Sequence, residues 1–154
     1  MSGIDSKSIV QSSDNAKWEL LQTAIESRSI RSAFELLRSN GVEPVLIKGW
    51  AAGRFYPKGI FRPTSDIDLA VAASDFENAD TLCRSSKPTG FAVDLHRELR
   101  HLDTCSWQDL FANSHLVDLD GEQIRVFRPE DHLRVLVVHW LTDGGWFRDR
   151  LWDI

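Results

Sequence analysis

Apolar residues recur along this chain with two periods, one typical of helices and one of strands. From residue 15 to residue 39 the spacing is helical, with apolar residues at Trp18, Leu21, Ile25, Ile30, Ala33, Phe34 and Leu37. A change of phase at residues 27–29 predicts two short helices or one bent helix, the second capped by Ser29. Asn40-Gly41 predicts the end of this helical region, because glycine readily adopts the left-handed conformation that ends helices. Residues 1–14 are polar and are expected to be frayed.

Two short apolar runs between Pro44 and Val71 predict strands. Residues 45–48 form the first strand, followed by a turn and a short helix at residues 49–56. Residues 67–71 form the second strand, which is entered through Asp66. No acidic residue lies between Pro44 and Ser65, whereas Lys48, Arg54, Lys58 and Arg62 are cationic. A cationic loop therefore leads directly into a strand that carries carboxylates.

The remaining elements follow from caps and turns. Residues 73–86 predict a helix capped by Ser74, and residues 91–96 alternate as a strand does. Ser106 begins a short helix, and Asp120-Gly121 joins strands 116–119 and 123–127 in a hairpin. Pro129 begins a helix that extends to Gly144-Gly145, and residues 146–154 begin another.

This order of elements predicts one α+β domain over residues 1–154. Residues 1–43 give helical support, residues 44–127 form the sheet and hold the site, and residues 128–154 are C-terminal helices. We expect a small mixed sheet of about five strands, with helices on one face and functional side chains on the open face. Segment 146–154 is amphipathic and has no C-cap, which predicts a truncated chain or packing against a partner subunit, such as a second copy.

Composition and charge narrow the classes of protein that fit. The chain has 154 residues, of which 42% are hydrophobic and 27% charged, enough for one core. No signal peptide or long apolar span is visible, so a soluble cytoplasmic protein without membrane contact is expected. Two cysteines without metal-ligand spacing argue against a disulfide framework or structural zinc. The net charge of −5 disfavours binding to an extended nucleic acid.

Three carboxylates and a lysine are the candidate chemistry. Asp66 and Asp68 project from one side of their strand, roughly 7 Å apart along the chain, and suit Mg²⁺ or Mn²⁺. The alternative is that both are solvated on an open strand face. Asp94 and His96 share one face of a later strand and add a third carboxylate. Lys48, at the end of the first strand, fits a phosphate contact and an ordinary strand end equally well.

The ordered set of motifs resembles the DNA polymerase β-like nucleotidyltransferase superfamily, most closely a bacterial branch labelled uncharacterised nucleotidyltransferases. The motifs are Ile47-Lys48-Gly49, Arg62 before Asp66-Ile67-Asp68-Leu69, and Val93-Asp94-Leu95-His96, and the likeness covers about residues 41–154. Trp50 departs from the superfamily, which usually has a serine or another small residue there.

The resemblance implies a reaction and a role for each motif. Asp66 and Asp68 would hold two divalent ions on the triphosphate, and Asp94 would hold the catalytic ion, the ions being Mg²⁺ or Mn²⁺. Lys48, Gly49 and Arg62 would bind the nucleotide, and His96 would be a phosphate donor or outer-shell partner, or else a strand-end histidine. The reaction would transfer a nucleoside monophosphate from ATP or another NTP to a hydroxyl acceptor and release pyrophosphate.

Two other classes of function fit the sequence. The first is a catalytically weak or inactive module that binds a nucleotide or a partner. The second is an antitoxin-like interaction protein that assembles through its C-terminal helices. The acceptor and the preferred base stay open.

Overall fold

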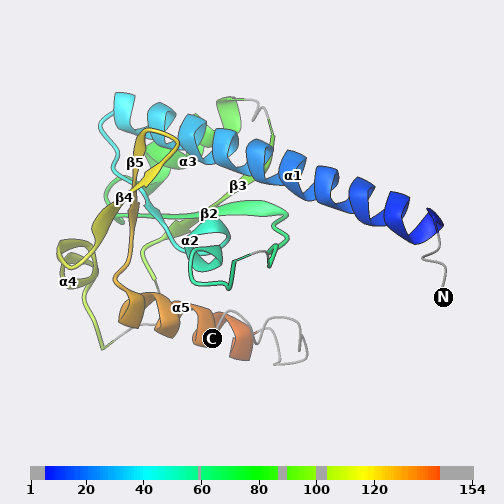
Figure 1. Ribbon diagram of the computed structural model, residues 1–154. Coiled ribbons are helices and arrows are strands. Elements are labelled where there is room, and N and C mark those ends of the chain that lie inside the picture. Colours follow the sequence, from blue (N-terminus) through cyan, green and yellow to red (C-terminus); the bar gives the residue numbers. More distant parts are fainter. Residues whose placement is uncertain (1–5, 59, 87–89, 100–103, 143–154) are drawn as a thin grey trace.

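A mixed sheet lies between two layers of helices (Figure 1). The computed structural model describes residues 6–58, 60–86, 90–99 and 104–142. The five strands are β1 (Val45–Leu46), β2 (Asp66–Val71), β3 (Ala92–Arg97), β4 (His115–Leu119) and β5 (Glu122–Val126), in the spatial order β3-β2-β1-β5-β4. β3 is parallel to β2 and β1 to β5, whereas β1–β2 and β4–β5 are antiparallel. The prediction of a small mixed α+β sheet is confirmed.

The N-terminal helical region is one helix, α1 (Ser6–Ser39), so the predicted alternative of two short helices that meet at residues 27–29 is wrong. The Ser29 hydroxyl does not cap a helix start; it donates to the Ile25 carbonyl at 2.7 Å and accepts from the Phe91 amide at 3.3 Å. The serines that disturb the apolar period thus pack against the rest of the molecule. The helix begins at Ser6, so residues 6–14, which were expected to be frayed, are helical, and residues 1–5 lie outside the described residues. The predicted end is confirmed by Gly41, whose φ is 80°.

Helices cover both faces of the sheet. α1 and α3 (Phe76–Ser85) pack on the core face, the face of Ile67, Leu69 and Val71. α4 (Trp107–Ala112) and α5 (Pro129–Thr142) pack over part of the site face, where Val45, Ile47 and Ala70 contact Trp107, Leu110 and Val135. From the sequence we expected helices on one face alone. The difference arises because consecutive residues of β1 are all buried, and a central strand buried on both faces needs cover on both.

Local signals placed several element ends correctly. The Ser106 hydroxyl accepts from the Asp109 amide at 3.1 Å and caps α4, as predicted. Asp120 and Gly121 have φ angles of 52° and 88°, the positive values of the predicted hairpin turn. The predicted Ser74 cap is wrong, because α3 begins at Phe76 and the Ser74 hydroxyl donates to the Asp75 carboxylate. The expected helix at residues 146–154, and any assembly through it, lies outside the described residues.

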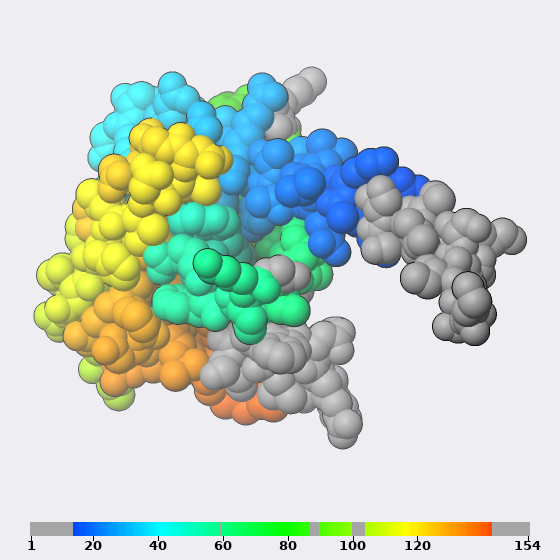
Figure 2. Space-filling view, in the orientation of Figure 1, coloured from blue at the N-terminus to red at the C-terminus, as the bar shows by residue number. Residues whose placement is uncertain are grey.

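An ion-pair network joins the end of α1 to the hairpin. The Arg38 guanidinium donates twice to Glu43, at 2.8 Å each, and once to Glu122 at 2.7 Å. Arg125 donates to the same Glu43 carboxylate at 3.0 Å. In Figure 2 the hairpin surface, in yellow, meets the end of α1, in cyan. Within the described residues, no helix has both the length and the apolarity needed to cross a bilayer.

Candidate metal and nucleotide site

Strand register brings together side chains that are far apart in the sequence. β2 and β3 run parallel, with Asp68 opposite Asp94 and Ala70 opposite His96. Alternate residues of a strand share a face, so Asp68, Asp94 and His96 all lie on the site face. Ile67 and Leu69 point the other way, into the core that α1 and α3 cover. Burial of these two side chains fixes which face the carboxylates occupy.

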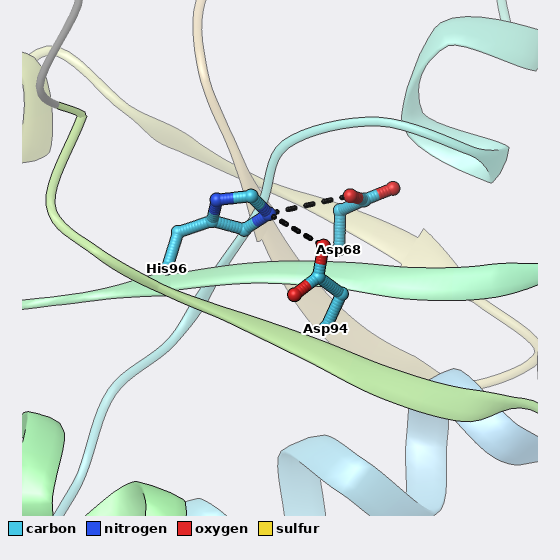
Figure 3. Close-up of side chains that lie close together, drawn as sticks. All are labelled: Asp68, Asp94 and His96. Carbon is cyan, nitrogen blue, oxygen red and sulfur yellow. Dashed lines mark hydrogen bonds and ion pairs between the residues drawn. The ribbon is translucent and has the colours of Figure 1, made fainter.

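Asp68, Asp94 and His96 point toward one another (Figure 3). The His96 Nε2 atom lies 3.3 Å from Asp68 Oδ1 and 3.3 Å from Asp94 Oδ2. One ligand atom from each residue lies within 4.8 Å of the other two. Asp68 is buried, whereas the Asp94 side chain is 56% exposed, so the group is open to solvent on the β3 side. Two carboxylates and an imidazole form a possible binding group for one divalent metal ion.

Lys48 lies against the same group from the end of β1. Its Nζ atom is 2.5 Å from Asp68 Oδ1, the oxygen that His96 Nε2 also approaches. Burial by itself raises the pKa of Asp68, but the hydrogen bonds from His96 and Lys48 and the Lys48 charge outweigh it and hold that pKa below its ordinary value. Asp68 is therefore ionised at neutral pH. Its carboxylate can therefore bind a cation, and one of its oxygens is already ion-paired with the Lys48 ammonium.

Asp66 lies on the same strand and the same face, but outside this group. It is opposite Ala92 in the register, is half-buried, and accepts a hydrogen bond from the Ser65 hydroxyl at 3.1 Å. It is not among the described side chains whose ligand atoms lie within 4.8 Å of one another. The structure thus brings together Asp68, Asp94, His96 and Lys48. Asp66 lies outside this group, two residues before Asp68 on β2.

Gly49 turns the chain from β1 into α2 (Trp50–Gly53) with a φ of 60°, a value that favours glycine. A Cβ atom at this position would lie 3.4 Å from both Glu26 Oε1 and Thr64 Oγ1. The loop is therefore packed closely against α1 and the segment before β2. It lies directly after Lys48, so the two residues predicted to bind a nucleotide adjoin the carboxylate group.

Glu26 of α1 holds this loop and was missed from the sequence, which assigned α1 a supporting role only. It is buried and accepts hydrogen bonds from the Thr64 hydroxyl and the Trp50 backbone N–H. Burial raises the pKa of Glu26 above its ordinary value, although Thr64, the Arg62 charge and Trp50 oppose the rise. The sequence does contain a signal for the burial of Glu26. This residue lies on the same face of the helix as the buried Ile30 and Phe34, at helical spacing.

Arg62 is placed beside the same loop. Its Nη1 atom donates to Thr64 Oγ1 at 3.2 Å, and its charge acts on Glu26. Arg62 thus orders the segment between Gly49 and β2, and its guanidinium lies near the positive-φ turn. His96, which the sequence left open between an outer-shell role and a strand end, lies between the two carboxylates.

Comparison with known proteins supports the fold. No family model matches the sequence, and a search of curated proteins found no significant match. A crystal structure of a Thermotoga maritima protein described as a "putative nucleotidyltransferase" is similar, with a TM-score of 0.56 and 17% sequence identity. The likeness covers 80% of this chain and 91% of the other. At this level of identity the likeness shows that the chain shares its fold with that protein, a nucleotidyltransferase-like fold.

Proposed function

We propose that this protein transfers a nucleoside monophosphate from an NTP, such as ATP, to a hydroxyl acceptor with release of pyrophosphate. The observation that carries the proposal is the convergence of Asp68, Asp94 and His96 beside Lys48, on adjacent strands of a nucleotidyltransferase-like fold. Carboxylates that are merely solvated on an open strand face are surrounded by water. They do not lie against a lysine and an imidazole, as this pair does.

The donor set fits a divalent ion. Asp68 and Asp94 supply hard oxygen atoms, which suit Mg²⁺ and Mn²⁺, and the His96 nitrogen favours a transition ion such as Mn²⁺. Bound there, such an ion would neutralise phosphate charge and lower the pKa of a hydroxyl group. Asp66 would contribute to a second ion once the triphosphate supplies further oxygen atoms.

The remaining residues would hold the nucleotide. Lys48 supplies a buried positive charge beside Asp68, at the position where phosphates would approach the ion. Gly49 follows Lys48 directly, and its positive-φ turn would bring the loop backbone close to the phosphates. Glu26, Thr64 and Arg62 fix the conformation of the loop, so that these groups need little rearrangement on binding.

Loss of either carboxylate tests the proposal directly. ATP with Mg²⁺ or Mn²⁺ is expected to raise the melting temperature of the wild-type chain, because a ligand that binds only the folded state stabilises it. Asp68→Asn and Asp94→Asn should abolish this shift. Asp14→Asn, an exposed carboxylate on α1, is the matched control and should keep it. A shift that survives in both site variants would contradict the assignment.

Release of pyrophosphate separates the enzyme from the non-catalytic alternative. The chain is incubated with radiolabelled NTP, Mn²⁺ and cell extract, and labelled products and pyrophosphate are followed. Transfer that requires Asp94 supports the proposal. Tight metal-dependent nucleotide binding without transfer in any extract would favour the inactive binding module.

A further inference from the structure

The first half of α1 carries a row of apolar side chains on its surface. Trp18 is 59% exposed and Leu21 is 50% exposed, and Ile25 is half-buried. In Figure 1 the first turns of α1, in blue, extend beyond the sheet and the other helices. Single exposed apolar side chains are ordinary on protein surfaces. These three instead follow one another at intervals of three and four residues, so they form a continuous stripe along the helix.

This stripe lies on the side of α1 that faces away from the core. Leu21 lies nine residues before the buried Ile30, a separation of about two and a half helical turns. The two side chains therefore point to opposite sides of the helix. Because the buried side of α1 packs on the sheet, a second helix can lie along the stripe without meeting that sheet.

Charged residues mark the two ends of the stripe. Asp14 precedes Trp18 by four residues, and Arg28 follows Ile25 by three, so the alternation of three and four continues to both. Both charged residues are exposed. The Asp14 Oδ1 atom lies 3.6 Å from Lys17 Nζ, but both side chains are mostly exposed, and such a pair contributes little stability. Asp14 can therefore exchange this contact for another cation at little cost. We call these five residues the α1 stripe: Asp14, Trp18, Leu21, Ile25 and Arg28.

This order of charges fits a second copy of the same chain in antiparallel orientation. In such a pair the Arg28 end of each α1 stripe lies against the Asp14 and Trp18 end of the other, and a two-fold axis makes this contact twice. A guanidinium is attracted to a carboxylate and also packs on an indole ring. In a parallel pair, Asp14 would face Asp14 and Arg28 would face Arg28, and these like charges repel.

We propose that two copies of this chain associate through the α1 stripe, as an antiparallel pair of helices. Leu21 and Ile25 form the apolar centre of the contact, and Arg28 of each copy contacts the partner's Asp14 and the partner's Trp18. Apolar side chains at alternating intervals of three and four residues are the sequence pattern of paired helices. The contact involves only a few turns of helix, so the dimer should depend on protein concentration. This inference does not depend on the proposed function.

Sedimentation equilibrium of the full chain, from about 1 µM to about 1 mM, tests the association. The wild type should change from monomer to dimer within this range. Leu21→Glu places a charge at the centre of the stripe and should raise the dissociation constant by about tenfold or more. Leu20→Glu makes the same change at a leucine that is 72% exposed and lies outside the stripe, and it should associate as the wild type does. Equal association of the two variants would overturn the inference. So would a monomer at every concentration, which would leave the stripe to a partner of another kind.

Charge reversal tests the orientation of the pair. Arg28→Glu should weaken association, because the new carboxylate meets the partner's Asp14. Asp14→Arg in the same chain should restore most of the loss. Arg31→Glu makes the same change of charge at an exposed residue outside the stripe and should have little effect. A double variant that associates no better than Arg28→Glu, or equal losses from Arg28→Glu and Arg31→Glu, would overturn the inference.

Hydrogen exchange gives a measurement on the unmodified chain. Raising the protein concentration over the same range should slow the exchange of amides 14–25 several-fold, because the paired helices must separate before these amides open. Amides 30–38 should be unaffected, because the core already protects this part of α1. If the chain dimerises while the exchange of amides 14–25 stays the same, the copies meet through another surface and the inference is wrong.

Discussion

Lys48 shows how one side chain can compete with a metal ion. Its ammonium lies 2.5 Å from Asp68 Oδ1, and both side chains are largely buried. A cation that binds Asp68 through this oxygen is repelled by the Lys48 ammonium and competes with it. The displaced ammonium would then be available to a phosphate, so metal and nucleotide binding would favour each other.

Replacing Lys48 tests this competition. Lys48→Met should tighten Mn²⁺ binding without nucleotide by about tenfold, equal to about 1.4 kcal/mol, because the competing charge is removed. The same change should weaken ATP binding in the presence of Mn²⁺. Calorimetry measures both affinities, and Lys48→Arg, which keeps the charge, is the control. If Lys48→Met leaves the Mn²⁺ affinity at the wild-type value, Lys48 does not compete with the ion.

Gly49 can be tested against Gly41, because both have positive φ angles, 60° and 80°. An alanine at either position is strained by about 1–3 kcal/mol. At Gly49 the added Cβ also meets Glu26 and Thr64 at 3.4 Å, whereas at Gly41 it meets nothing within 4 Å. Gly49→Ala should therefore lower the free energy of unfolding in urea more than Gly41→Ala does. Equal losses would mean that the Glu26 contact imposes no constraint on the loop.

At the scale of elements, the Glu43 network connects α1 to β5 and the hairpin. Burial by itself raises the pKa of Glu43, but hydrogen bonds from Arg38 and Arg125 and their charges outweigh it and lower that pKa below 4.5, its ordinary value. A carboxyl whose pKa is lower in the folded state stabilises the fold fully above its unfolded pKa. This contribution is lost as the pH falls below about 4.5 and through the folded value.

Glu43→Gln should make that loss visible. At pH 7 the variant should be less stable than the wild type by about 1.5–3 kcal/mol, the range for hydrogen bonds to charged groups. The difference should shrink as the pH falls below 4.5, because the wild-type carboxyl becomes protonated. Urea unfolding at several pH values measures it, with the exposed Glu19→Gln as control. A difference that stays constant over this range would rule out the linkage.

At the scale of the whole molecule, α1 is supported along only part of its length. Its first turns extend beyond the sheet and the other helices in Figure 1. Residues 14–24 are exposed or half-buried, and the buried positions begin at Glu26. Helices of fewer than ~12–15 residues are marginal in water without tertiary packing.

Amide hydrogen exchange should therefore divide α1 into two parts. Amides of residues 14–22 should exchange about a hundredfold faster than those of residues 30–38, which open only when the core around Phe34 and Leu37 opens. The two parts belong to one helix, which makes each a control for the other. Uniform protection along α1 would show that a further contact supports its first turns.

The sequence by itself determined the elements whose signals are local. Gly41 and Ser106 marked an end and a start of helices, and Asp120-Gly121 marked the hairpin, because each acts through its own backbone conformation or nearby hydrogen bonds. Alternation placed Asp68 on the face opposite Ile67 and Leu69, and Asp94 on the face of His96, for the same reason.

Only the tertiary structure decided which of these side chains meet. The β2–β3 register sets Asp68 opposite Asp94 and Asp66 opposite Ala92, so His96 joins the carboxylate group and Asp66 does not. Packing over sequence-distant segments kept α1 continuous at Ser29 and buried Glu26 against the Gly49 loop. No pattern within a single segment contains this information, because register and burial are set by contacts between segments that are far apart in the chain.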